Sequence, residues 1–69
     1  MNAQRYQILL GLFEGMEKMM DEDYCLDCMS PSNNDDLSLV STSLCIPFAE
    51  AVEFIDYHQA AIVTKTMTE

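Results

Sequence analysis

Two stretches of this sequence, residues 2–22 and 47–66, place their apolar side chains at the spacing of one helix face. Apolar residues that recur every three or four positions are typical of amphipathic helices, which bury that face against a neighbour. The sequence therefore predicts an all-α fold with two main helices. The apolar face of the first is formed by Tyr6, Leu9, Leu10, Leu12, Phe13, Met16, Met19 and Met20. The apolar face of the second is formed by Phe48, Ala51, Val52, Ile55, His58 and Ile62.

The apolar face of the first helix covers more than half of its circumference, which is more than one neighbouring helix can cover. We therefore expect an αα-hairpin whose wide faces meet those of a second copy in a small bundle, as a homodimer. The side chains predicted for the core and for self-association are Leu9, Leu12, Phe13, Met16, Met20, Phe48, Val52, Ile55 and Ile62.

The segment between the two helices is predicted as a connection that contains a short extra helix or turn. Pro31 and the run of Ser, Asn and Asp that follows it break regular structure. Residues 37–46 fit a short helix capped by Asp35 or Asp36, although their Ser, Thr and Val content also fits a strand. Pro47 suits the first position of the last helix, where its missing N–H is no loss.

A mixed fold is the alternative to the all-α prediction. The β-branched residues near the C-terminus could form a strand at 61–67, paired with a second strand at 39–45. This alternative is an α+β fold in place of the helical bundle.

The size of the chain limits its stability. Its 69 residues form a single domain, 1–69, and a chain of this length buries only about 60% of its unfolded surface. Small domains are usually stabilised further by disulfides, a metal or self-association. Three cysteines, an odd number, favour a reducing compartment over a disulfide framework, so the expected location is the cytoplasm.

The cysteines suggest one metal-site alternative. Cys25 and Cys28 are spaced so that both thiolates could reach one zinc ion, with Cys45 as a third ligand. A redox role is disfavoured, because the acidic residues around the pair do not lower a thiol pKa. We predict no metal and no cofactor, with a zinc-stabilised module as an alternative.

The charge of the chain restricts its partners. Twelve acidic residues against three basic ones give a formal net charge of −9, which repels nucleic acid and anionic lipid. No stretch approaches the roughly 20 apolar residues of a membrane span. A larger protein with a basic surface is the expected partner, with no direct nucleic acid and no membrane. The predicted interaction surface consists of two acidic rows, Glu14, Glu17 and Asp21 on the first helix and Glu50, Glu53 and Asp56 on the last.

His58 is the only histidine and lies on the apolar face of the last helix. A single histidine in that position is typical of a hydrogen-bonded core or interface residue, with a pH-sensitive interface as its functional alternative. The sequence contains no phosphate-binding loop, no nucleophile elbow and no catalytic triad pattern. We therefore expect no enzymatic activity.

Together these observations predict a small acidic regulatory or adaptor protein that acts by protein–protein interaction through an acidic helical surface. Short acidic chains of this kind occur among accessory proteins of phages and mobile elements. One alternative is an acidic mimic of nucleic acid that inhibits a DNA- or RNA-binding enzyme, since rows of carboxylates can imitate spaced phosphates. The zinc-stabilised module is the other.

Overall fold

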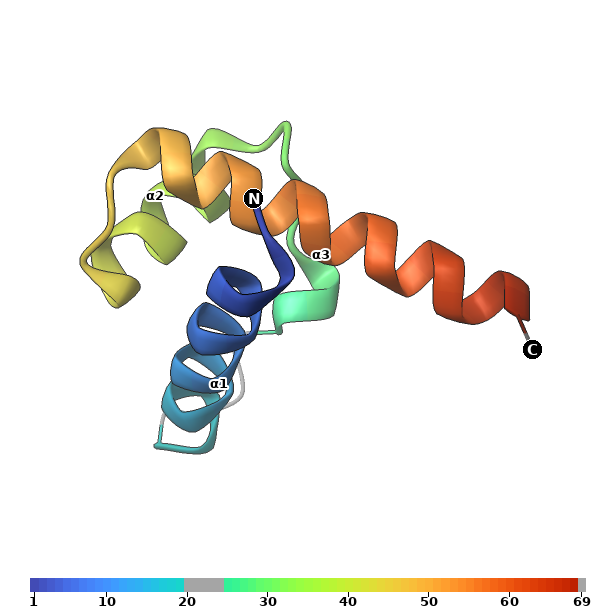
Figure 1. The fold of residues 1–69 in the computed structure, drawn as a ribbon. Helices are drawn as coiled ribbons and strands as arrows, with labels where there is room; N and C mark the ends of the chain where they lie inside the picture. Colours follow the sequence, from blue (N-terminus) through green and yellow to red (C-terminus); the bar gives the residue numbers. More distant parts are fainter. Residues whose placement is uncertain (20–24, 69) are drawn as a thin grey trace.

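The structure is a computed structural model, which describes residues 1–19 and 25–68 and, among these, the side chains of residues 1–16 and 25–64 (Figure 1). Every regular element within these residues is helical. They are α1 (Ala3–Met19), the 3₁₀ helix η1 (Leu26–Cys28), α2 (Asn34–Leu44) and α3 (Phe48–Thr68). The all-α prediction is confirmed. The α+β alternative is wrong, because residues 39–45 lie in α2 and its C-terminal cap and residues 61–67 lie in α3.

The three α-helices form a compact domain around the first half of α3. Figure 1 shows α1 starting beside the middle of α3 and diverging from it. In the same view α2 lies beside the first turns of α3, and η1 lies beside the middle of α3. The C-terminal turns of α3 continue beyond the rest of the domain. The short extra helix expected in the connection is α2, which has 11 residues and contributes Leu37 and Val40 to the core. No second copy is present, so self-association stays a prediction.

Local side-chain hydrogen bonds define where the helices begin. The Asn2 side chain accepts the Arg5 N–H at 2.7 Å at the start of α1. Asn33 caps α2 by accepting the Asp35 N–H at 2.9 Å, so the predicted cap at Asp35 or Asp36 is wrong by two or three residues. An asparagine is as good a cap as an aspartate, and the sequence offers both in one run.

The corner between α2 and α3 is closed by hydrogen bonds around Cys45. Its backbone is left-handed, with φ 56° and ψ 44°, a conformation in which glycine is usual. The Cys45 and Ile46 N–H groups donate to the carbonyls of Thr42 and Ser41 at 3.3 and 3.0 Å, which satisfies the end of α2. The next helix begins at Phe48 and not at the proline before it, which places Pro47 in the cap position.

The core is built from one narrow face of each helix. In α1 the buried side chains are Tyr6, Leu9 and Phe13, and in α3 Phe54 and Ile55 are completely buried. The remaining core residues are Leu26, Met29, Leu37, Val40, Ile46 and Ala51. The sequence analysis missed Phe54, which lies among Ala51, Ile55 and His58 on a helical wheel.

Two of the predicted core residues lie outside this core. Leu12 is 53% exposed, because the buried seam of α1 is narrower than its apolar arc. Phe48 is 45% exposed, because it lies in the first turn of α3, at the edge of the domain. Three others, Leu9, Phe13 and Ile55, are buried as predicted. The last four differ in what the structure says of them. Met16, Val52 and Ile62 are partly buried, and Met20 lies outside the described residues.

Candidate interaction surface

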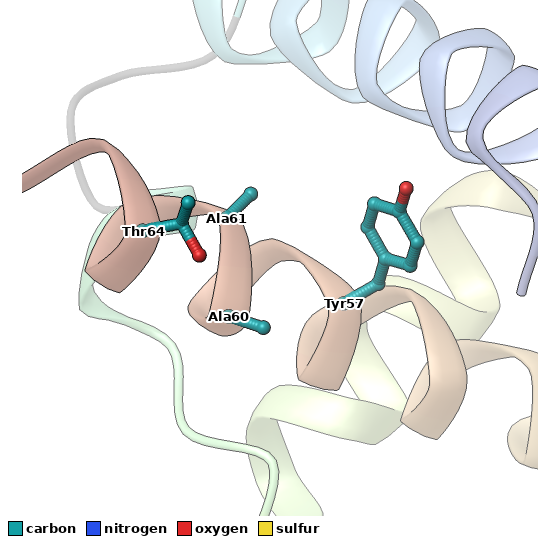
Figure 2. Close-up of a pocket in the computed structure, with 4 residues that line it drawn as sticks. All are labelled: Tyr57, Ala60, Ala61 and Thr64. Atoms are coloured by element: carbon teal, nitrogen blue, oxygen red, sulfur yellow. The ribbon is translucent and has the colours of Figure 1, made fainter. Parts of the chain in front are cut away.

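A shallow hollow lies on the surface of α3 (Figure 2). It has a volume of about 420 Å³ and is lined by Tyr57, Ala60, Ala61 and Thr64. The lining is mainly apolar, and the two alanines leave the space that larger side chains would fill. In Figure 2 the Tyr57 ring forms one wall and projects towards α1. The hollow is therefore a concave apolar site on an otherwise convex helix.

The wall formed by Tyr57 is held by α1. The Tyr57 and Tyr6 rings lie with their centroids 4.6 Å apart, within the range of favourable aromatic contacts. Tyr6 is itself buried, and its ring also contacts Phe54 at a centroid distance of 5.7 Å. The hollow thus has one fixed wall.

Two exposed carboxylates border the hollow. Glu53 precedes Tyr57 by one helical turn, and Asp56 precedes Ala60 by one turn, so both lie beside the lining on α3. Glu53 stays 58% exposed although one oxygen lies 3.5 Å from the α-amino nitrogen of Met1. Asp56 makes no ion pair with any of the residues described here. The hollow therefore has a negatively charged border.

The third carboxylate of this row is engaged within the chain. Arg5 donates to Glu50 through Nε at 2.6 Å and through Nη2 at 3.3 Å. The Arg5 hydrogen bond lowers the pKa of Glu50, and the same contact raises the pKa of Arg5. Glu50 thus joins α3 to the start of α1 and is less available to a partner than Asp56.

Of the acidic row predicted on α1, the structure describes the side chain of Glu14 alone. Glu14 is exposed and faces a different cavity, described below. The side chain of Glu17 and the whole of Asp21 lie outside the described part of the chain. Of the two rows, the structure therefore describes a usable surface on α3.

A smaller, polar cavity of about 220 Å³ lies between α1, η1 and α3. It is lined by Glu14, Cys25, Leu26, Asp27 and His58. His58 is only 7% exposed and has a partner on each ring nitrogen. Its Nδ1 lies 2.8 Å from the Tyr6 hydroxyl, and its Nε2 lies 2.8 Å from Oδ1 of Asp27. The prediction of a hydrogen-bonded core histidine is confirmed.

The hydrogen bonds in this cavity connect separate parts of the fold. A neutral imidazole has one donor and one acceptor, so a hydroxyl of Tyr6 that donates to Nδ1 leaves Nε2–H to donate to Asp27. Burial raises the pKa of the Tyr6 hydroxyl, and the nearby charge of Glu14 adds to this effect. Both nitrogens of His58 are occupied, and it joins three elements of the fold. Sequence reasoning did not pair His58 with Asp27, because 31 residues separate them.

The cysteines do not gather in one place. Cys25 and Cys28 are exposed at the two ends of η1, and Cys45 is exposed at the end of α2. Among the described residues, no three His, Cys, Asp or Glu side chains are grouped so that they could hold a metal ion. The zinc alternative receives no geometric support.

No single helix in the described ranges has both the length and the apolar character of a membrane span. Within these ranges, α2 and residues Phe48–Thr64 together have that length and apolar character, but the two helices are bent by 108° relative to each other. No protein family, no curated protein and no solved structure matches this chain.

Proposed function

We propose that this protein is a small, non-catalytic regulatory or adaptor protein that acts by binding a larger protein on the side of α3 that carries Tyr57 and Ala60. The observation that carries this proposal is the apolar hollow at Tyr57 and Ala60, with the exposed carboxylates of Glu53 and Asp56 beside it. A buried apolar anchor supplies most of the affinity in such contacts, and charges around it raise the association rate.

The partner that fits this surface is a basic segment with one large apolar side chain. The side chain enters the hollow, and lysines or arginines beside it lie near Glu53 and Asp56. The net charge of −9 attracts such a segment before contact is made.

The alternative of a nucleic-acid mimic has weaker support. A mimic needs a row of free carboxylates, whereas Glu50 is paired with Arg5 and Glu53 lies near the α-amino group of Met1. Salt distinguishes the two functions, because a purely ionic contact weakens steeply with ionic strength and an apolar anchor does not.

Affinity capture with a matched pair of variants tests the proposal. Ala60→Arg fills the hollow from an exposed helix position, and Ser38→Arg makes the same change on the exposed side of α2. We expect one host protein to be captured by the wild type and by Ser38→Arg, also at high salt. In a titration with that purified partner, Ala60→Arg should bind at least about tenfold more weakly than either. Equal binding to both variants contradicts the proposal, provided that circular dichroism shows both to be folded.

A further inference from the structure

The outer side of α1 carries an apolar strip that the domain does not cover. Ile8 and Leu12 lie one turn apart and are 49% and 53% exposed. They lie outside the buried seam of α1. Gly11 and Gly15 lie beside them, and a methyl group added at either glycine would meet no atom within 4 Å apart from its chain neighbours and the backbone of its own helix. The outer strip, defined as Ile8, Gly11, Leu12 and Gly15, is therefore open within one chain.

The charge of α1 differs from that of the rest of the chain. Within Ala3–Met19 the two cations Arg5 and Lys18 balance the two carboxylates Glu14 and Glu17, so the formal charge of the helix is zero. The net charge of −9 therefore belongs entirely to the residues outside α1. The outer strip itself contains no ionisable side chain.

We propose that the outer strip of α1 is the contact between two copies of this chain. Two molecules of charge −9 repel each other, and like charges brought face to face oppose association. The outer strip of α1 lets two copies meet without opposing carboxylates at the contact. In a two-fold arrangement, Ile8 and Leu12 of one copy pack over Gly11 and Gly15 of the other.

This contact is independent of the proposed function, because it uses α1 and leaves the hollow on α3 free. It also gives a role to the two glycines inside α1, where each lowers helix stability relative to alanine. A partner protein on the same strip is the competing occupant.

Sedimentation equilibrium over micromolar to millimolar protein concentrations tests the contact. We expect the mass to rise from the 7.8 kDa of one chain towards twice that value. Leu12→Glu and Ile8→Glu should each raise the dimer Kd about a hundredfold, because the two-fold axis brings both new carboxylates into one apolar contact. Val63→Glu is the matched control, since Val63 is an apolar residue of α3 with a similar exposed fraction of 55%.

Salt provides a second measurement. Screening weakens the repulsion between two chains of the same charge, so the dimer Kd should fall as salt is added. A wild type that stays monomeric at millimolar concentration overturns the proposal, as does a dimer that Val63→Glu dissociates and Leu12→Glu does not. A monomeric wild type whose captured host protein is lost with Leu12→Glu assigns the strip to that partner and also overturns it.

Discussion

The two long helices, α1 and α3, use their surfaces in opposite ways. The middle of α3 is buried completely at Phe54 and Ile55, and the exposed side of this helix is acidic. In contrast, α1 buries a narrow seam, has no net charge and exposes Ile8 and Leu12. In a domain this small, the apolar content of a helix does not indicate how much of it is buried.

The largest expected effect tests the claim that α3 supplies the centre of the core. Phe54→Ala should lower the free energy of unfolding by about 3–5 kcal/mol, because it empties a completely buried site. That loss is comparable with the whole stability of a small domain. Urea unfolding followed by circular dichroism measures it.

Phe48→Ala is the matched control on the same helix. Phe48 is 45% exposed, and its removal should cost less than about 1 kcal/mol. Similar losses in the two variants would show that the centre of α3 is not where the core lies.

The second effect concerns the buried contact between α1 and α3. Tyr6→Phe removes the hydroxyl that bonds His58 Nδ1 and should cost about 1–3 kcal/mol, because a buried nitrogen loses its partner. The raised pKa of Tyr6 adds a dependence on pH. The contribution of Tyr6 to the free energy of unfolding is complete below a pH of about 10, the pKa of an unfolded tyrosine. It is lost as the pH rises through the pKa of Tyr6 in the folded protein.

Tyr57→Phe is the control for this measurement. The hydroxyl of Tyr57 makes no hydrogen bond to the described residues, so its loss should change unfolding by less than about 0.5 kcal/mol. If the alkaline unfolding curves of Tyr6→Phe and the wild type are the same, Tyr6 is not the group whose ionisation lowers the stability at high pH.

The third effect tests the open side of α1. Gly11→Ala and Gly15→Ala should each stabilise the monomer by about 0.5–1 kcal/mol, because alanine is the better helix former and its methyl group meets nothing. The measurement is made in the Leu12→Glu background, which keeps the chain monomeric. In the wild-type background the same changes should weaken the dimer, and a lower monomer stability would contradict the open strip.

The smallest effect concerns the ion pair that joins the start of α1 to α3. Arg5 lowers the pKa of Glu50, so this pair stabilises the fold above the unfolded glutamate pKa of about 4.3 and is lost as the pH falls through the folded pKa. Acid unfolding of Glu50→Gln should therefore depend slightly less on pH than that of the wild type. Because both groups are accessible to solvent, added salt should reduce the difference.

The helices were predictable because their apolar spacing is local information. The predicted apolar face of α1 contains Tyr6, Leu9 and Phe13, which form the seam that the structure buries. The full apolar arc misled, because Leu12 belongs to the outer strip and nothing in the periodicity separates the two uses of an apolar side chain. Phe54 was missed because the apolar residues Phe48 and Val52 shifted the predicted face of α3 away from its true centre.

The candidate site was predictable only in part. The acidic row of α3 follows from the sequence, but its pairing with Arg5 depends on where the start of α1 meets α3. The hollow depends on two alanines in succession beside an aromatic residue, which is an ordinary pattern within a helix. The contact between Asp27 and His58 joins two distant segments, and such contacts leave no periodic signal.

The contact between the Tyr6 and Tyr57 rings has a practical consequence. The chain contains no tryptophan, so its tyrosines dominate its near-ultraviolet absorption and its fluorescence. The two rings touch across the junction of α1 and α3 and one hydroxyl is bonded to a histidine, so separation of these helices should change the emission of both rings. Opening of the domain, and events at the neighbouring hollow, can thus be followed optically without a label.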